Sequence, residues 1–435
     1  MTDDPMRVLL LNQTFYPDVA ATAQHGHDLA RTLVADGHEV VAIASRSIYG
    51  RKGAALPAHE FADGIEIHRV GASVFGKSGG SLGRLIDFGL WYLLAAWKAF
   101  RIRRCDVCVA FTTPPFIALV GVALRWFRRT KLVYWVMDLY PDVPVLYGMM
   151  RPRGVLTRIL ESIHRFILRQ SDRVIALGRC MEERLRAKGA PPDRLRVVRV
   201  WADRNEVRPK GPGKSAYRAS WDLDSKFVAM YSGNFGMMHD ATTLLEAARA
   251  LRDRDDIVFL IVGGGARRAE AEAFVAEHGL TNVRFEPYQP RESLDELLIL
   301  GDVHLISMID GAEGLVVPCK LFGILAAARP AVFIGPPLSE IGRVIEEEGC
   351  GAVIEVGDTP SLVATIERYA ANRAGADADG AAGRRALEHK YDRSLACDSI
   401  RTILLEVVGA TEPTSSPVAE CDANSNTTRQ REAVG

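Results

Sequence analysis

A single lysine at the start of a predicted helix is the strongest chemical signal in this 435-residue chain. Lys320 follows Pro318, which fits the first position of a helix over 318–328, and no other lysine lies between Lys226 and Lys390. A cation in the first helical turn opposes the helix dipole, whereas a bound anion would offset this clash and use the free N–H groups. We therefore predict a phosphate contact for Lys320; a surface lysine with its stem over apolar neighbours is the alternative.

Two glycine-containing turns could bring backbone N–H groups to the same anion. The predicted strand 227–233 ends in SGNFG (232–236), and the predicted strand 257–264 runs into GGG (263–265). Glycine lets the backbone approach a ligand closely, although an ordinary strand-to-helix turn has the same composition. The residues expected to contact substrate in this half of the chain are Gly233, Asn234, Gly236, Gly264 and Pro318.

Acidic side chains near other predicted strand ends could bind hydroxyl groups. Two acids and two aromatic residues occur within WVMDLYPD (135–142), and Glu313 lies in the loop before the helix 318–328. Carboxylates accept hydrogen bonds from sugar hydroxyls, and aromatic rings can cover the apolar face of a sugar. Each residue alone could be structural. The prediction of a sugar site therefore depends on their shared position at the carboxyl ends of the strands, facing one cleft. The candidates in the first half of the chain are Gln13, His25, Asp138 and Asp142.

The elements that would position these residues are short apolar runs alternating with longer runs of helical periodicity. This alternation predicts parallel sheets with helices on both faces. The predicted strands are 7–12, 39–45, 65–70, 106–111, 132–138, 173–178, 196–200, 227–233, 257–264, 283–288, 302–308, 331–335 and 352–356. The predicted helices are 22–36, 85–100, 115–127, 154–169, 179–188, 240–251, 266–278, 291–299, 318–328, 338–348, 360–371 and 393–408.

A polar, proline- and glycine-containing stretch at 203–226 divides this series into two sets. We therefore predict two doubly wound α/β domains, over 1–205 and 206–375, then a C-terminal helical segment over 376–410. A small, polar stretch precedes its last helix, and residues 411–435 have too few apolar side chains to fold. Ligands bind beyond the carboxyl ends of such strands, so the interdomain cleft is the expected site.

One motif indicates a different class of protein. Gly71–Ser78 matches the phosphate-binding loop of nucleotide hydrolases, with Lys77 as its lysine, and it follows a predicted strand. Such a loop must open directly into a helix, and Gly79, Gly80 and Gly83 disfavour one. A flexible, basic loop is the alternative.

Composition excludes several other classes. Lys plus Arg and Asp plus Glu both total 54, so no global charge indicates nucleic acid. The pair Cys105 and Cys108 lies in a predicted strand, where the side chains face opposite sides, and no further ligand pair suggests a metal. The start MTDDPM lacks the positive residues of an export signal, and no uninterrupted run of about 18 apolar residues occurs. We expect a cytoplasmic protein.

Two very apolar predicted helices nonetheless suggest contact with a membrane surface. The helices 85–100 and 115–127 contain Trp91, Trp97 and Trp126, a residue type that favours membrane interfaces. Between Lys98 and Lys131 the chain has eight basic residues and one acid. We predict peripheral association with anionic lipid on the inner face of the cytoplasmic membrane; ordinary core helices are the alternative.

Taken together, these stretches resemble glycosyltransferase family 4, in particular its bacterial polysaccharide branch, similar to colanic acid biosynthesis enzymes. The matching segments occur in order over most of the chain. They are LLLNQTFYPDVAATAQH (9–25), ARTLVADGHEVVAIASR (30–46), VYWVMDLYPD (133–142), MYSGNFG (230–236), FLIVGGG (259–265), GLVVPCKLFGILAAARPAVFIGP (314–336) and EIGRVIEEEGCGAVI (340–354).

The resemblance implies a GT-B fold, in which two Rossmann-like domains face a cleft and the last helix returns to the first domain. It implies a retaining transfer from a nucleotide diphosphate sugar, without metal or cofactor, to a lipid-linked glycan in cell-surface polysaccharide synthesis. By resemblance, the turn at 232–236 and Lys320 lie at the donor phosphates and Glu313 at the donor sugar. We assign Asp138 to the acceptor hydroxyl, which makes Asp138, Glu313 and Lys320 the expected catalytic residues.

The chain departs from the family pattern at two places. Gly323 stands where many members have a second glutamate on the ribose, and Asn234 and Met238 stand near an expected arginine and lysine. The charge on the diphosphate would then have to come from Lys320, from helix N-termini and from an arginine that the sequence does not place. A nucleotide-sugar epimerase of the same double-sheet plan, a nucleotide hydrolase using Lys77 and an inactive scaffold remain alternatives.

Overall fold

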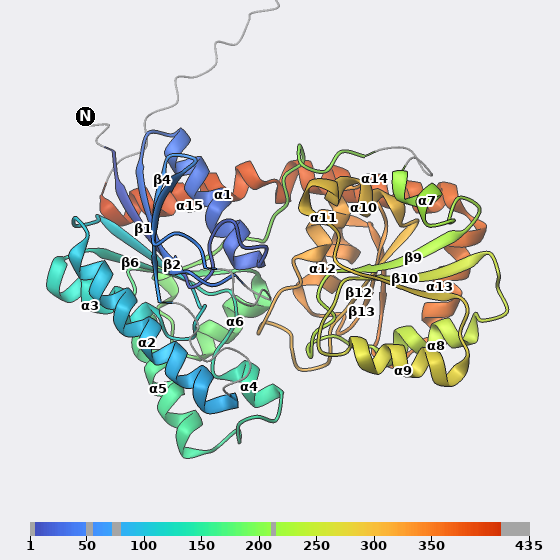
Figure 1. The fold of residues 1–435 in the computed structure, drawn as a ribbon, viewed down its shortest axis with the longest axis horizontal. Coiled ribbons are helices and arrows are strands. Elements are labelled where there is room, and N and C mark those ends of the chain that lie inside the picture. The colour runs from blue at the N-terminus through green and yellow to red at the C-terminus, as the bar shows by residue number, and fades with distance from the viewer. Residues whose placement is uncertain (1–4, 49–54, 72–79, 210–214, 410–435) are drawn as a thin grey trace, which may run out of the picture.

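The computed structural model describes residues 5–48, 55–71, 80–209 and 215–409. Within them, two mainly parallel sheets flanked by helices form two domains side by side (Figure 1). This confirms the predicted fold class. Lys77 and most of the Gly71–Ser78 motif, together with the tail 411–435, lie outside the described residues.

The first sheet has eight strands in the order β3-β4-β2-β1-β5-β6-β7-β8, and only the edge pairing of β3 with β4 is antiparallel. Its strands are β1 (Arg7–Leu11), β2 (Glu39–Ser45), β3 (His59–Ala62), β4 (Ile65–Val70), β5 (Val107–Ala110), β6 (Lys131–Trp135), β7 (Arg173–Ala176) and β8 (Leu195–Val197). Its helices are α1 (Ala21–Ala35), α2 (Gly80–Arg101), α3 (Ala118–Arg128), α4 (Asp142–Leu146), α5 (Val155–Gln170), α6 (Arg179–Ala187) and the 3-10 turn η2 (Pro192–Arg194).

The second sheet has six parallel strands in the order β11-β10-β9-β12-β13-β14. They are β9 (Phe227–Ser232), β10 (Ile257–Val262), β11 (Val283–Glu286), β12 (Val303–Ser307), β13 (Ala331–Ile334) and β14 (Gly351–Ile354). The helical elements are α7 (Ala216–Ser220), α8 (Thr242–Ala250), α9 (Arg268–His278), η3 (Arg291–Ser293), α10 (Leu294–Leu300), α11 (Lys320–Ala326), α12 (Glu340–Glu348), α13 (Thr359–Ala371), α14 (Arg373–Ala386), the π turn η4 (Leu387–Tyr391) and α15 (Arg393–Val408).

Most elements lie where the apolar pattern predicts them, because strands covered on both faces read as continuous apolar runs. Every residue of β10, for example, is buried. The short elements β3, α4 and α7 were not predicted, since four or five residues are too few to show a period.

The small, polar stretch before the last helix, which is missing from the predicted helices, forms helix α14. Its sequence lacks a stripe of large apolar side chains because the backbone of α14 packs directly against the second domain. A Cβ on Gly380, for example, would lie 2.2 Å from the carbonyl oxygen of Ala328. Gly383 likewise faces Leu325 of α11. Helix α14 therefore packs on the second domain, and the predicted boundary at residue 376 cuts through it.

Helix α2 begins at Gly80, two residues after Ser78. The sequence suggested that the glycines disfavour a helix here, whereas Gly80 and Gly83 lie within α2. Its 22 residues include a long apolar segment that packs on the sheet, where Trp91 and Ala95 are buried, and this packing outweighs the poor propensity of two glycines.

Two segments cross between the domains, and they are hydrogen-bonded to each other. Ala202 accepts from the backbone N–H of Arg393 (N···O 3.0 Å) and donates to the carbonyl of Tyr391 (3.3 Å). Helix α15 then lies along α1 of the first domain, where Arg401 pairs with Asp36 (Figure 1).

Candidate active site

Both sheets reverse their strand order at one point, and these points position the candidate residues. The order changes between β1 and β5 in the first sheet and between β9 and β12 in the second. Loops at the carboxyl ends of such strands leave a crevice that commonly binds ligands. The SGNFG turn follows β9, and the loop leading to Lys320 follows β12, so the second crevice lies between them.

Lys320 reaches across this crevice to the SGNFG turn. Its Nζ donates to the hydroxyl of Tyr231 and to the carbonyl of Asn234 (3.2 Å), and it lies 3.7 Å from the centroid of the Tyr231 ring. No carboxylate pairs with it among the described residues, and burial lowers the pKa of Lys320 to about 7. A desolvated ammonium without a counter-ion favours an anionic ligand.

Lys320 is the first residue of α11, whose N-cap is Cys319. The sequence suggested that Pro318 occupies the first helical position. This was wrong, because Pro318 lies before the N-cap. The prediction that Lys320 lies in the first turn agrees with this structure.

The two glycine turns interlock beside Lys320. The backbone N–H of Phe235 donates to the carbonyl of Gly264 (2.6 Å), and a Cβ on Gly263 would lie 2.2 Å from the carbonyl oxygen of Gly233. Gly233 and Gly263 also have positive φ angles, 109° and 129°, which other residues rarely adopt. The structure thus brings Gly233, Asn234, Gly236, Gly264 and Lys320 together.

An arginine that the sequence analysis could not assign lies at the same place. The backbone N–H of Arg267 donates to the carbonyl of Phe235 (3.0 Å), which ties it to the SGNFG turn. Burial, and then the charges of Lys320 and Arg267, lower the pKa of His239 to about 3. Burial and then Asp138 raise the pKa of Tyr147 in the first domain, whereas Arg267 lowers it. The guanidinium of Arg267 itself pairs with Glu270 of α9 (Nη1···Oε2 3.5 Å). An arginine two residues after a glycine triplet has no distinctive pattern.

Asp138 and Glu313 lie on two loops that meet between the domains. The residue after Asp138, Leu139, donates its backbone N–H to the carbonyl of Leu315 (2.9 Å). Burial raises the pKa of Asp138 to about 6. The Oε2 atom of Glu313 is buried and has no hydrogen-bond partner in the described structure, while its carbonyl accepts from Arg184.

The other predicted residues of the first domain, Asp142, His25 and Gln13, make contacts within the protein that could be purely structural. Asp142 pairs with Lys188 (Oδ2···Nζ 2.8 Å) and lines a cavity of about 390 Å³ at the domain junction. The ring of His25 is buried edge-on to Trp201 (4.5 Å), and burial lowers the pKa of His25 to about 4. Gln13 lies at the end of β1, where its backbone N–H donates to Thr113 (2.7 Å).

Two Rossmann-like domains with a crevice at the strand ends are the arrangement of the GT-B fold. Family models agree: "Glycosyl transferase 4-like domain" matches residues 21–201 and "Glycosyl transferases group 1" matches residues 214–386. The chain belongs to glycosyltransferase family 4, as its motifs predict, and it is an enzyme of this class.

Relatives and solved structures support the same assignment. The chain is 26% identical over 375 residues to the glycosyl transferase WcaI of Escherichia coli K12, named for colanic acid biosynthesis, covering 83% of this chain and 92% of WcaI. Sucrose-phosphate synthase of Thermosynechococcus elongatus has a TM-score of 0.73 at 16% identity, covering 93% of this chain and all of that one. Anabaena HepE, solved with UDP-glucose, has a TM-score of 0.68 at 14% identity, covering 92% and 100%. Among the described residues, no helix has both the length and the apolar character needed to cross a membrane.

Proposed function

We propose that this glycosyltransferase moves a sugar from a nucleotide diphosphate sugar to a lipid-linked glycan, with retention at the anomeric carbon. The single observation that supports the donor site is the ammonium of Lys320, which lies against the SGNFG turn and has no acidic partner among the residues that the structure describes. HepE, a structural neighbour, was solved with UDP-glucose, so a uridine diphosphate donor is the first to test.

In this proposal the donor diphosphate lies between the two glycine turns and the start of α11. Lys320 and Arg267 face its oxygens, and the N–H groups of the SGNFG turn add hydrogen bonds. These fixed groups stabilise the negative charge that develops as the bond from the anomeric carbon to the phosphate oxygen breaks. Because two side-chain cations meet this charge, the proposed mechanism requires no metal ion or cofactor.

Retention follows if the acceptor attacks from the face that the diphosphate leaves. The acceptor oxygen forms the new bond to the anomeric carbon, and its proton passes to the departing phosphate oxygen. The enzyme then contributes mainly position and electrostatics. Glu313 orients the hydroxyls of the donor sugar, and Asp138 holds the acceptor hydroxyl from the first domain.

Ribose recognition must use residues other than the usual glutamate. A Cβ on Gly323 would lie 3.3 Å from Cδ1 of Leu298, so this position faces apolar packing. No acid in the family's second position is therefore available to bind the ribose hydroxyls.

We also propose that the first domain lies on an anionic membrane. Aromatic side chains of α2, α3 and α5 form one exposed surface, here called the apolar face. Phe100 lies 6.4 Å from Phe127, and Trp126 lies edge-on to Phe166 at 5.8 Å, so these side chains connect the three helices. The apolar face consists of Leu93, Trp97, Phe100, Trp126, Phe127, Val155, Leu156, Ile159 and Phe166. Trp91, which the sequence placed at the same interface, is instead buried.

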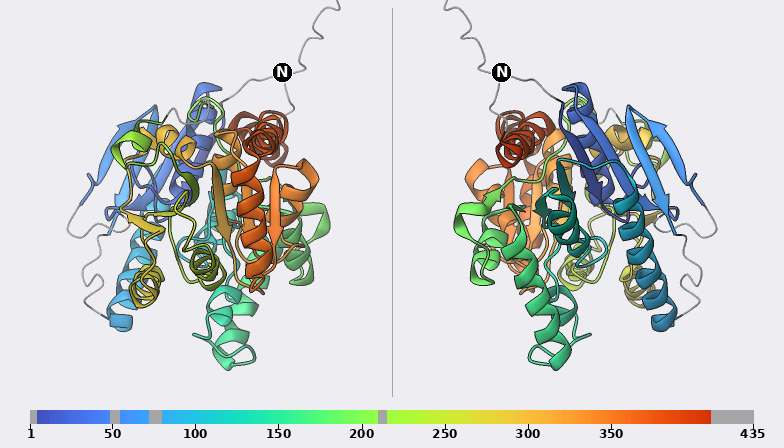
Figure 2. Two further views of the ribbon diagram at one scale, coloured as in Figure 1. Left: turned by 90° about the vertical axis from the view of Figure 1, so that its right-hand side faces the viewer. Right: turned by 90° about the vertical axis from the view of Figure 1, so that its left-hand side faces the viewer.

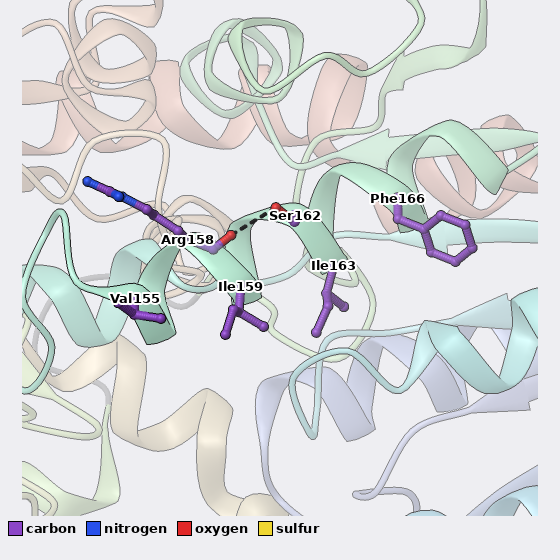
Figure 3. Close-up of a pocket in the computed structure, with 6 residues that line it drawn as sticks. All are labelled: Val155, Arg158, Ile159, Ser162, Ile163 and Phe166. Carbon is purple, nitrogen blue, oxygen red and sulfur yellow. Dashed lines mark hydrogen bonds between the residues drawn. The ribbon is translucent and has the colours of Figure 1, made fainter.

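Helix α5 extends this surface beyond the two helices that the sequence indicated. Val155, Ile159 and Ile163 point to one side of α5 and line a shallow pocket (Figure 3). Basic residues border the apolar face: Arg101 lies over the ring of Trp97 at 4.6 Å, and Arg128 binds nearby carbonyl groups. Apolar residues bordered by cations suit the surface of an anionic bilayer. A membrane position would give the enzyme access to a lipid-linked acceptor.

A thermal-shift titration without added metal tests the donor site. Uridine, guanosine, thymidine and adenosine diphosphates would each be added to the wild type, Lys320→Ala and Lys77→Ala. We expect one diphosphate to raise the melting temperature of the wild type and of Lys77→Ala, because it binds the folded state, but not of Lys320→Ala. Stabilisation only by magnesium–ATP, lost in Lys77→Ala, would contradict the proposed donor site.

A further inference from the structure

A cluster of two histidines and a glutamate lies at the outer edge of the first sheet, away from the interdomain crevice. His59 is on the edge strand β3, and Glu66 and His68 are on its neighbour β4. Figure 2 shows the blue strands of this sheet edge at the margin of the first domain. One ligand atom from each side chain lies within 4.8 Å of the other two. We propose that these three residues bind a divalent transition-metal ion, with Zn²⁺ as the best fit.

The strand register explains why the three side chains meet. His59 pairs directly with His68 across the antiparallel ladder, so their side chains lie on one face of the sheet. Glu66 is two residues before His68 on the same strand and therefore points to that same face. The two imidazole rings stack, with centroids 4.6 Å apart and planes 18° apart.

Of the two distances within the cluster, one suits tetrahedral metal ligands and the other is that of a hydrogen bond. The Oε1 atom of Glu66 lies 2.9 Å from Nε2 of His68 and 3.5 Å from Nε2 of His59. Bonds of about 2.0–2.2 Å to nitrogen and oxygen at tetrahedral angles place neighbouring ligand atoms about 3.3–3.5 Å apart. The pair of Glu66 and His59 meets this distance, whereas the hydrogen-bonded pair of Glu66 and His68 would have to separate by about 0.5 Å to admit the ion. Two imidazoles and one carboxylate are a ligand set that zinc commonly uses, with water in the fourth position.

The surroundings prepare the carboxylate for this role. Arg7 holds the other oxygen of Glu66 (Nη2···Oε2 3.0 Å), which leaves Oε1 directed at the histidines, and second-shell contacts of this kind orient metal ligands. Two cations, Arg7 and Lys98, face the cluster and oppose a bound cation. Arg7 also pairs with Glu39, which offsets its charge.

A bound ion would attach the edge strand to the sheet. β3 has four residues and, within the described part of the chain, pairs only with β4. A metal bridging His59 to β4 would add a side-chain link across this single pairing. We therefore expect zinc to protect the backbone amides of β3 from hydrogen exchange. This proposal is independent of the proposed donor and acceptor.

The test uses the full-length protein after chelation and dialysis. Zn²⁺ is added, and the metal retained per chain is measured together with the melting temperature and the exchange of β3 amides. We expect His59→Ala to retain one zinc fewer than the wild type and to lose the zinc-dependent stabilisation and protection. His278→Ala, which removes a histidine from α9, should behave like the wild type in all three measurements.

Two further variants keep the test decisive if one substitution disturbs the edge. Glu66→Gln retains the shape of the side chain but removes its charge, and Co²⁺ in place of Zn²⁺ reports four-coordinate geometry through its visible absorption. We expect the cobalt absorption in the wild type and in His278→Ala, but not in His59→Ala or Glu66→Gln. Equal zinc retention by the wild type and His59→Ala would overturn the proposal.

Discussion

The backbone N–H of Leu139 in the first domain donates a hydrogen bond to the carbonyl of Leu315 in the second, with an N···O distance of 2.9 Å. Leu139 follows Asp138, and Leu315 lies two residues after Glu313. The bond therefore joins the loop with the proposed acceptor residue to the loop with the proposed donor-sugar residue. Because this hydrogen bond joins the two loops, a change in the relative position of the domains would alter both the bond and the separation of the two carboxylates.

The pH dependence of kcat/KM should have two limbs that come from the free enzyme. Burial raises the pKa of Asp138 to about 6 and lowers that of Lys320 to about 7. If Asp138 acts ionised and Lys320 acts protonated, kcat/KM rises through pH 6 and falls above pH 7. Lys320→Arg should move the alkaline limb to much higher pH, and Asp138→Asn should remove the acidic limb. An unchanged profile in both variants would contradict these roles.

Removing the charge of Lys320 should stabilise the ligand-free protein while it abolishes activity. The pKa of Lys320 falls from 10.5 to about 7 on folding, so the unfolded chain binds more protons between these pH values, and stability rises with pH across this window. We expect Lys320→Met to melt higher than the wild type at pH 6–7 and the difference to shrink towards pH 10. Lys390→Ala, which removes a surface lysine, serves as the control. A lower melting temperature for Lys320→Met at pH 6 would refute this account.

Arg267→Ala should weaken binding of the nucleotide diphosphate and slow transfer. Removal of one preorganised group that faces developing charge typically costs about 3 kcal/mol, or about 100-fold in kcat. Isothermal titration and initial rates would measure both effects. Arg252→Ala provides a matched control, because this arginine is exposed on the second domain. Equal affinity and rate in Arg267→Ala and Arg252→Ala would remove Arg267 from the site.

Substitution of aromatic residues on the apolar face should reduce binding to anionic vesicles. Trp97 is 54% exposed and Phe127 is 76% exposed, so serine at both positions removes apolar surface with little loss of packing. We expect the double variant to sediment less with vesicles containing anionic lipid and to keep its activity on a soluble acceptor. Phe61→Ser is the control, since Phe61 is 70% exposed on β3, outside the apolar face. Vesicle binding equal to that of the control would argue against this surface.

The sequence predicted the fold well because apolar runs reflect burial on both faces of a parallel sheet. The predicted segments 39–45, 65–70 and 393–408 coincide with β2, β4 and α15. Helix α14 was missed for a physical reason. Its glycines permit close packing on α11, and small residues at a contact look the same in the sequence as small residues in a loop.

The candidate site was predictable where a residue type was unusual for its position. Lys320 stood out because it opposes a helix dipole, and the SGNFG turn stood out for its glycines. Arg267 carried no such signal, because its role depends on which loops approach the turn in space. The ion pair between Asp142 and Lys188 could not be predicted either, because the two residues are distant in the sequence.

The return of α15 to the first domain also affects the order in which the chain can fold during synthesis. Helix α15 buries Ile400, Leu404 and neighbouring residues, and it lies along α1. The ribosome makes α1 early and α15 only after the entire second domain. The first domain therefore leaves the ribosome with one apolar surface uncovered, and it completes its own core only when the last described residues emerge.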